Sequence, residues 1–273
     1  MFEKIQHIGY PTSDLDAAVS WFERFFGGKN AGGGNLDKSY AVPSGGRNAY
    51  VSFGQVEAEI IEPEDREGLS KDALTMHHVG YVVSDIQGVA STLRGRGLKL
   101  ASDAPFTNVM GQQVWYFDAS TTNGVMIHLT QLPDQPDSTD TSHSIEVERI
   151  MHAGYLVPNL EEAISWYVDR LDGQLVGSGG SLAGGRNAYV NFGQVQVELI
   201  QPGEGGPTLG PGHSIDHVGY VVGDMITCMG HCRARGFVFV EGAPGTNPIK
   251  QQVSYFETAT SMGSRMHLTQ LPD

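Results

Sequence analysis

The segment GGRNAYVSFGQVEAEIIEP (45–63) returns almost unchanged as GGRNAYVNFGQVQVELIQP (184–202), an offset of 139 residues (184 − 45). Further segments return at the same offset: HHVGYVVSDI (77–86) as DHVGYVVGDM (216–225), QQVWYF (112–117) as QQVSYF (251–256), and HLTQLPD (128–134) as HLTQLPD (267–273). Self-similarity at a fixed period is the signature of a repeat architecture. The chain is therefore a tandem duplication.

The duplication predicts two domains, residues 1–134 and 147–273. Between them lies QPDSTDTSHSIE (135–146), a polar stretch without an apolar period. Such a composition is typical of a linker.

A second, weaker repeat lies inside each half. HIGYPTSDLDAAVSWF (7–22) and HVGYVVSDIQGVASTL (78–93) each combine an alternating strand, an Asp or Ser cap and a helix with apolar residues three and four apart. HAGYLVPNLEEAISWY (152–167) and HVGYVVGDMITCMGHC (217–232) repeat the pattern, and short runs such as NAYVSFG and VEAEIIEP follow as strands. We therefore expect an α+β chain of four βαβββ modules, in which two modules pair to close a barrel-like cup.

The composition excludes several classes of function. Hydrophobic residues make up 40% and charged residues 18% of the 273 residues, as in soluble globular proteins. The net charge of −14 argues against a nucleic acid or an anionic membrane as partner, because phosphate binding needs a basic face. No apolar run reaches the roughly 18 residues of a transmembrane helix, and MFEKIQHIGY reads directly as a strand, so no signal peptide is expected.

The two cysteines, Cys228 and Cys232, lie one turn apart on an expected helix. We interpret them as reduced packing residues, which fits a cytoplasmic protein. Nothing in the sequence indicates the oligomeric state.

The phrase H-[IV]-G-Y before a capped helix, with a later E-[IL]-I-x-P strand, resembles the vicinal oxygen chelate superfamily. That superfamily includes glyoxalase I, methylmalonyl-CoA epimerase, extradiol dioxygenases and the bleomycin- and fosfomycin-resistance proteins. The resemblance covers nearly the whole chain apart from the linker, and it implies two pairs of half-barrel modules, each pair with a divalent-metal site.

In that family, each module supplies one metal ligand from its first strand and one from its last. The first-strand positions here are His7, His78, His152 and His217, and the last-strand positions are Glu59, His128, Glu198 and His267. The separations within the modules are 52, 50, 46 and 50 residues. The other histidines that we considered match no ligand position and are interpreted as ordinary loop or helix residues: His77, His143, His213 and His231.

Each half thus offers three imidazoles and one carboxylate. This nitrogen-rich set suits Fe(II), Ni(II), Co(II), Mn(II) or Zn(II) better than Mg or Ca, with up to two ions per chain. On an octahedral ion, four protein ligands leave two neighbouring positions for substrate or water. The ligands could come from modules 1 with 2 and 3 with 4, or from modules 1 with 4 and 2 with 3, and the tandem layout favours the first pairing.

Other repeated polar residues are candidate substrate contacts. They are Arg47, Asn48, Gln113 and Tyr116 in the first half, and Arg186, Asn187, Gln252 and Tyr255 in the second. Strand alternation places Gln112 and Gln113 on opposite faces, so only one of them can face a substrate. Two interpretations of Arg47 stay open: it holds a carboxylate or phosphate, or it is a solvated turn residue.

Three functions follow from the resemblance. The first is proton transfer next to a metal-bound carbonyl, as in a glyoxalase, epimerase or lyase, with His128, His267, Glu59 and Glu198 as ligands and candidate bases. This chain departs from glyoxalase I and the epimerase in that its modules 2 and 4 end on His instead of Glu. The second is an extradiol type of non-haem Fe(II) dioxygenase, which needs two His, one carboxylate and three free positions. The third is a non-catalytic small-molecule binding or resistance protein, whose relatives usually lack the metal residues.

Overall fold

The computed structural model describes residues 1–134, 142–180 and 184–272, and it contains the four expected modules. The first module comprises β1 (Lys4–Pro11), α1 (Leu15–Phe26), β2 (Lys29–Leu36), β3 (Gly46–Phe53) and β4 (Val56–Pro63). The second comprises β5 (His78–Val82), α2 (Ile86–Gly95), β6 (Phe106–Thr107), β7 (Gln113–Tyr116) and β8 (Met126–Gln131). The third comprises β9 (Arg149–Leu156), α3 (Leu160–Leu171), β10 (Gln174–Gly180), β11 (Arg186–Phe192) and β12 (Val195–Gln201). The fourth comprises β13 (Ser214–Val221), α4 (Met225–Ala234), β14 (Gly245–Thr246), β15 (Gln252–Tyr255) and β16 (Arg265–Gln270). The predicted α+β class and the βαβββ repeat are confirmed.

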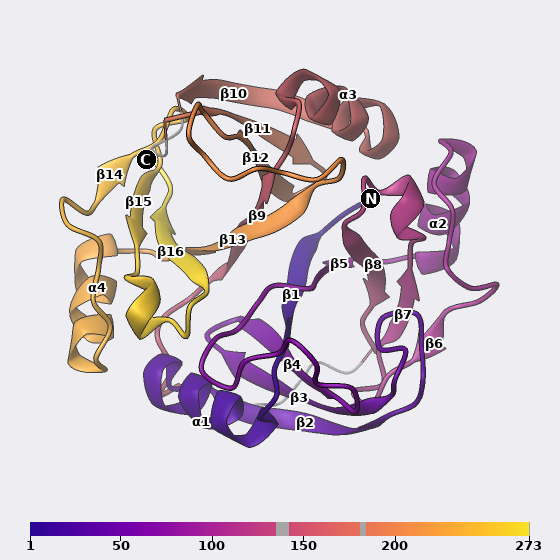
Figure 1. Cartoon of the computed structure of the whole chain (residues 1–273), viewed down its shortest axis with the longest axis horizontal. Helices are drawn as coiled ribbons and strands as arrows, with labels where there is room; N and C mark the ends of the chain where they lie inside the picture. The colour runs from indigo at the N-terminus through magenta and orange to yellow at the C-terminus, as the bar shows by residue number, and fades with distance from the viewer. Residues whose placement is uncertain (135–141, 181–183, 273) are drawn as a thin grey trace.

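The strands of the described residues form one 16-stranded sheet that curves into two halves, which we call the first and the second cup (Figure 1). The first cup has the order β2-β3-β4-β1-β5-β8-β7-β6, and the second has the order β10-β11-β12-β9-β13-β16-β15-β14. In each cup the first strands of two consecutive modules pair antiparallel, and each also pairs parallel with the last strand of its own module. A bridge between Ile5 of β1 and Ile150 of β9 joins the two cups into one sheet.

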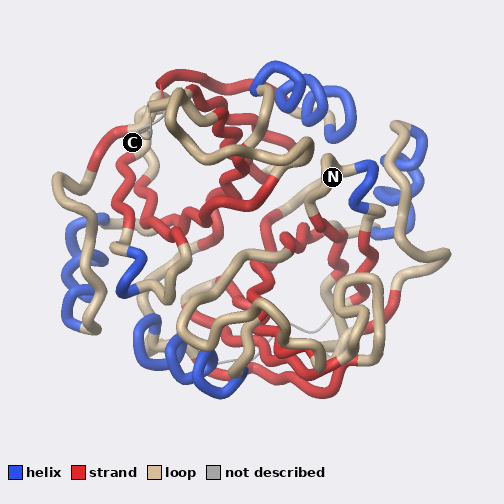
Figure 2. Tube along the Cα trace, viewed as in Figure 1, coloured by secondary structure: helices blue, strands red, loops and turns tan. Residues whose placement is uncertain are grey.

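The helices lie on the outside of the cups (Figure 2). Each helix begins after a short polar residue whose side chain accepts a hydrogen bond from the first turn, as the sequence predicts. These N-cap residues are Asp14, Asp85, Asn159 and Asp224. In each module, the cap fixes the point where the chain turns from the first strand onto the outer face of the sheet.

One hydrophobic core runs through both halves. Phe26 at the end of α1 is fully buried, and its ring centroid lies 5.1 Å from that of Phe237 and 5.8 Å from that of Tyr220, both in the second half. At the N-terminus, the ring of Phe2 packs on Phe192, with centroids 5.0 Å apart. The halves therefore share an apolar interface in addition to the strand bridge.

Part of the expected linker is packed against the first half. Residues 135–141 lie outside the described residues, but Ile145 is only 1% exposed and its N–H donates to the carbonyl of Phe26 at 2.8 Å. The hydroxyl of Ser144 accepts from the N–H of Gly54 at 2.6 Å. This packing could not be predicted from the sequence, because a single isoleucine makes no apolar period. The domain limits 1–134 and 147–273 stay a prediction.

Two smaller expectations can be compared with the structure. Cys228 and Cys232 are free and buried on α4, as expected of packing residues. Among the described residues, no helix is long and apolar enough to cross a membrane.

The shared core makes a stability prediction. Truncating Phe26→Ala removes a fully buried ring between the halves, and we expect the free energy of unfolding to fall by about 3–5 kcal/mol, the usual cost of such a cavity. Urea unfolding followed by tryptophan fluorescence measures the change. Ile226→Ala is the control, since Ile226 is 66% exposed and should cost little. A loss below about 1 kcal/mol in Phe26→Ala would contradict the shared core.

Candidate metal centres

The four predicted ligands of the first half meet at one point inside the first cup, and we call them the first centre. His7 comes from β1, Glu59 from β4, His78 from β5 and His128 from β8. The Nε2 atom of His7 lies 3.2 Å from Nε2 of His78 and 3.3 Å from Nε2 of His128. The Oε2 atom of Glu59 lies 3.0 Å from Nε2 of His78 and 3.3 Å from Nε2 of His7.

The second half repeats this arrangement in the second centre, formed by His152, Glu198, His217 and His267. The Nε2 atom of His152 lies 3.1 Å from Nε2 of His217 and 3.2 Å from Nε2 of His267. The Oε2 atom of Glu198 lies 3.3 Å from Nε2 of His217 and 3.4 Å from Nε2 of His152. Both centres are therefore built by modules 1 with 2 and 3 with 4, and not by the exchanged pairing.

The glycine of each H-x-G-Y phrase makes room for the ligands. Gly9 on β1 lies in register with Glu59 on one side and with His78 on the other. A Cβ atom on Gly9 would stand 2.1 Å from Cε1 of His78, and one on Gly154 would stand 2.0 Å from Cε1 of His217. Since no side chain fits at such distances, the glycine is needed for the imidazole to turn across the neighbouring strand toward the centre.

His128 and His267 each present an unprotonated nitrogen to their centre. The Nδ1 atom of His128 lies 3.3 Å from the carbonyl of Leu129, and Nδ1 of His267 lies 3.2 Å from the carbonyl of Leu268. A carbonyl oxygen only accepts, so Nδ1 carries the proton and Nε2 keeps its lone pair. Burial, together with the other two histidines of each centre, lowers the pKa of His128 and His267 well below the usual value, which keeps the rings neutral.

The buried donors of each centre suit a cation. The Nε2 atom of one imidazole lies 3.1–3.3 Å from the Nε2 atoms of the other two, and the oxygen of a buried carboxylate contacts two of the three rings. Three imidazole nitrogens and one carboxylate oxygen form a suitable donor set for a first-row divalent metal. The structure thus assigns one such donor set to each half.

The carboxylate of each centre is held by amide and phenol groups. Asn48 Nδ2 donates to Oε1 of Glu59 at 2.6 Å, and the Tyr50 hydroxyl donates to the same oxygen at 2.9 Å. In the second centre, Asn187 Nδ2 donates to Oε1 of Glu198 at 2.8 Å. Burial raises the pKa of Glu59, but hydrogen bonds with His7 and His78 outweigh burial and hold that pKa well below the usual range. Oε2 is thereby left free to face the centre.

The residue that precedes His78 in the first half differs from the residue that precedes His217 in the second half. Asp216 Oδ2 accepts from Nδ1 of His217 at 2.9 Å, and Arg265 binds the same carboxylate at 2.6 Å. In the first half the corresponding residue is His77, whose Nδ1 lies 3.1 Å from Nδ1 of His78. His77 lies in a loop and is not one of the donors, as predicted, but it contacts the neighbouring His78 directly.

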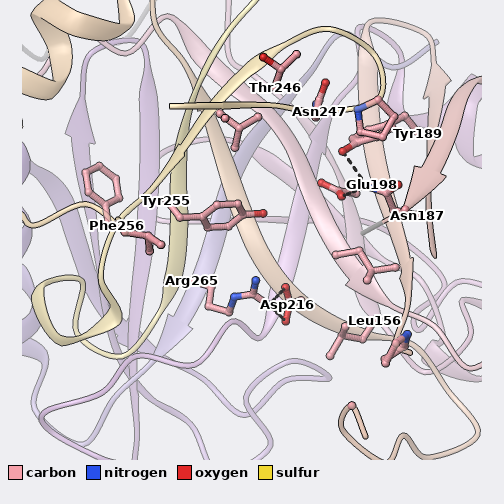
Figure 3. Close-up of a pocket in the computed structure, with 18 of the residues that line it drawn as sticks. Leu156, Asn187, Tyr189, Glu198, Asp216, Thr246, Asn247, Tyr255, Phe256 and Arg265 are labelled. Carbon is pink, nitrogen blue, oxygen red and sulfur yellow. Dashed lines mark hydrogen bonds and ion pairs between the residues drawn. The ribbon is translucent and has the colours of Figure 1, made fainter. Parts of the chain in front are cut away.

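A cavity of about 700 Å³ opens onto the second centre, with Glu198 among its lining residues (Figure 3). Two of the predicted substrate contacts, Asn187 and Tyr255, line it. In the first half the equivalent Asn48 and Tyr116 also face the centre: Asn48 bonds Glu59, and the ring of Tyr116 lies 4.7 Å from that of His128.

The two arginines lie elsewhere. Arg47 forms ion pairs with Glu62 and with Asp16 of α1, and Arg186 pairs with Glu161 of α3 at 2.7 Å. The alternation of β3 and β11 turns these side chains toward the outer helices, on the face opposite Asn48 and Asn187. Arg47 is therefore not a solvated turn residue: it lies on β3 and binds carboxylates of the protein itself, away from the centre.

The two glutamines are also turned away from the cups. Gln113 and Gln252 are exposed at the start of β7 and β15, and they alternate with Tyr116 and Tyr255. Their neighbours Gln112 and Gln251 are buried, and each accepts from a loop asparagine, Asn108 at 3.0 Å or Asn247 at 2.8 Å. The prediction that Gln113 and Gln252 contact substrate is therefore wrong. Strand alternation puts their neighbours, Gln112 and Gln251, on the inner face instead.

Comparison with known proteins places the chain in a fold family. The sequence model of the Glyoxalase/Bleomycin resistance protein/Dioxygenase superfamily matches residues 6–116 and 151–255, once in each half. No curated protein sequence matches the chain.

Solved structures share the fold at low sequence identity. A Mn(II)-bound glyoxalase from Novosphingobium aromaticivorans is similar with a TM-score of 0.67 and 14% identity, over 98% of this chain and 82% of that one. The 2,3-dioxygenase LapB from Pseudomonas sp. KL28 gives 0.69 and 13%, over 100% and 93%. A mutant of 4-hydroxymandelate synthase from Streptomyces coelicolor gives 0.68 and 13%, over 99% and 93%. At this identity the likeness shows a common fold.

The two centres predict the metal content. We expect about two divalent ions per chain, and we expect His7→Ala to lower this to about one, because the first centre loses one of its four donors. Elemental mass spectrometry on protein purified without chelator measures it, with His231→Ala as the control. If His7→Ala loses all its metal, the two centres are coupled and not independent.

The close approach at the glycines predicts a more selective loss. In Gly154→Ala the new methyl group displaces the His217 ring, so the second centre should lose its metal while the first keeps its own. Gly230→Ala on α4 is the matched control, because a Cβ there meets nothing within 4 Å. Metal content and thermal unfolding are measured together. Unchanged metal content in a folded Gly154→Ala protein would refute the spacing argument.

Proposed function

Since the chain belongs to the Glyoxalase/Bleomycin resistance protein/Dioxygenase superfamily, we propose that it is a divalent-metal-dependent enzyme that moves a proton at a carbon next to a carbonyl group. Its substrate is a small molecule with two neighbouring oxygens. The observation that carries this proposal is the convergence of three buried imidazoles with one carboxylate, that of Glu198, which also lines a cavity.

The metal is held by His152, Glu198, His217 and His267 in the second half, and by His7, Glu59, His78 and His128 in the first. A divalent ion on these donors supplies a Lewis acid that polarises a bound carbonyl and lowers the pKa of the neighbouring C–H. Iron, nickel, cobalt, manganese and zinc all suit this set, and manganese occupies the similar glyoxalase structure.

Glu198 is the proposed base, and Glu59 is its counterpart in the first half. Both His267 and Glu198 are candidates, but Nδ1 of His267 is held by the carbonyl of Leu268 and by the hydroxyl of Thr269 at 3.1 Å. These contacts fix the ring, as they fix His128 in the first half. Glu198 instead lines the cavity and directs a carboxylate oxygen toward the centre, where it can accept a proton from a bound substrate.

The cavity suits a substrate with an apolar body. Its walls include Leu156, Ile200, Val253 and Phe256, while the hydroxyl of Tyr255 provides a polar group near the centre. A volume of about 700 Å³ lies within the usual range of small-molecule sites. We therefore propose that an α-hydroxy or α-keto thiol adduct, or an acyl thioester, places its oxygens at the centre and its apolar part against these walls.

The alternative is an extradiol type of dioxygenase. Such a site uses two His and one carboxylate and keeps three positions open. Here a third imidazole, His267, lies 3.2 Å from Nε2 of His152, so a metal held by all four residues would keep fewer positions for substrate and oxygen. This fourth donor favours proton transfer over oxygen activation.

A base variant tests the proposal. Glu198→Gln keeps the size of the side chain but not its basicity, so solvent deuterium exchange into the substrate should fall by about 100-fold or more while metal content stays near that of the wild type. Exchange is measured by mass spectrometry on the adducts and thioesters named above. Glu241→Gln, at an exposed site, is the control.

The dioxygenase gives a different set of results. Iron as the main metal, oxygen uptake with catechols and no deuterium exchange in the wild type would reject proton transfer in favour of the alternative. No metal even after reconstitution would reject both.

A further inference from the structure

The two halves differ in length at one place near the centres. His7 and Glu59 are 52 residues apart, whereas His152 and Glu198 are 46 apart. The six additional residues fall between β2 and β3, in the segment DKSYAVPSG (37–45), which we call the capping segment.

The capping segment packs into the first cup. Ala41 and Val42 are 8% and 6% exposed, although they lie in a loop. They form a separate apolar cluster with side chains from the inner face of the cup: Ile61, Val114 and Tyr116, with Leu36, Ala101 and Met126 partly buried against it.

This cluster lies next to the first centre. Ile61 is two residues beyond Glu59 on β4, and Met126 is two residues before His128 on β8, so each shares a face with a ligand. The ring of Tyr116 packs on His78 and His128, with centroids 5.7 Å and 4.7 Å away. The capping segment thus occupies the part of the cup through which a substrate would reach these ligands.

The equivalent residues of the second cup line a cavity instead. Ile200, Val253, Tyr255 and Arg265 correspond to Ile61, Val114, Tyr116 and Met126, and all four line the cavity of about 700 Å³. In Figure 3 the labelled Tyr255 and Arg265 stand along the cavity beside Glu198. One set of equivalent residues therefore surrounds a cavity, while the other is packed beneath the capping segment.

Hydrogen bonds hold the capping segment in place. The N–H groups of Ser39 and Gly45 both donate to the carbonyl of Val42 at 3.0 Å, and Val42 N–H donates to the Ser39 hydroxyl at 3.1 Å. At the tip, the Tyr40 hydroxyl accepts from the N–H of Ala119 at 2.6 Å. These contacts tie the segment both to itself and to the second module.

We propose that the first centre is a closed, structural metal site, and that substrate binds and reacts at the second centre alone. The inference rests on the proposed function for the reaction, but the closure itself rests on packing. The two duplicated halves then differ in role: the metal of the first stabilises its cup, and the metal of the second also binds substrate.

A bidentate oxygen ligand tests the closure independently of turnover. The full chain is loaded with Co(II) and titrated with acetohydroxamate, which takes two neighbouring positions on a metal and changes the visible spectrum of cobalt. We expect about two cobalt ions per chain but only about one equivalent of bound acetohydroxamate. His267→Ala should abolish that binding, because it disrupts the second centre.

Opening the first cup should allow a second equivalent of acetohydroxamate to bind. A deletion of residues 38–43 shortens the capping segment by the six residues that separate the halves, and the double variant Ala41→Gly/Val42→Gly removes the packed side chains at full length. Either variant, with both cobalt ions retained, should bind about two equivalents. The glycine variant serves if the deletion does not fold.

Two equivalents bound by the wild type would overturn the proposal, and so would binding that stays at one equivalent in an opened protein with both metals. The proposed function fails in a different way, by absence of deuterium exchange in the wild type while acetohydroxamate still binds at one equivalent. The two failures are therefore distinguishable.

Discussion

Each half of the molecule is organised around the requirement that four buried donors reach a single point from four different strands. Imidazole rings can do this only by crossing the backbone of a neighbouring strand, and in register with each ring stands a glycine. Gly80, for example, lies beside His128 on β8 and beside His7 on β1, and a Cβ there would be 2.5 Å from Cε1 of His128. The H-x-G-Y phrase thus provides one ligand and, two residues later, the space for the ring of another ligand. This constraint fixes the register of the central strands in both cups.

The duplication has preserved this inner geometry and has changed what surrounds it. The Nε2 contacts of the two centres agree within about 0.1 Å, yet the group behind the β5 and β13 ligands is His77 in one half and the Asp216–Arg265 pair in the other. A carboxylate behind a metal-binding imidazole raises the basicity of that ligand and fixes its orientation. In accord with this, burial lowers the pKa of His78, whereas hydrogen bonds with Asp216 and Glu198 overcome burial and raise the pKa of His217. In the second centre, the Asp216–Arg265 pair therefore holds the ring of His217 in place. This is also the centre whose Glu198 lines the cavity.

The sequence predicted the repeat and the module order because each of these leaves a periodic trace, and its resemblance to the vicinal oxygen chelate superfamily indicated the donors that meet. It failed where the answer depends on which residue begins a strand. Gln113 and Gln112 differ by one position, and with strand alternation a one-residue difference moves a side chain to the opposite face. The prediction that Arg47 contacts substrate failed for a related reason. Its partners Asp16 and Glu62 become neighbours only when α1 folds back over the sheet. The capping segment left no pattern of its own: Ala41 and Val42 are two apolar residues in a polar loop, and their burial depends on the cup beneath them.

The arrangement also explains why neither module of a half is a complete unit. A module provides two donors and half of a cup, and it leaves its first strand with an unpaired edge; the antiparallel pairing of β1 with β5, or of β9 with β13, closes both deficits at once. Because the donors of one centre come from both modules, the pairing of the modules and the binding of a metal would favour each other, so the free energy of binding would also contribute to folding. The apolar contacts of Phe26 and Phe2 then join two such cups without involving either centre. The separation of these roles allows one cup to be filled and the other left open while the shared framework of the chain stays the same.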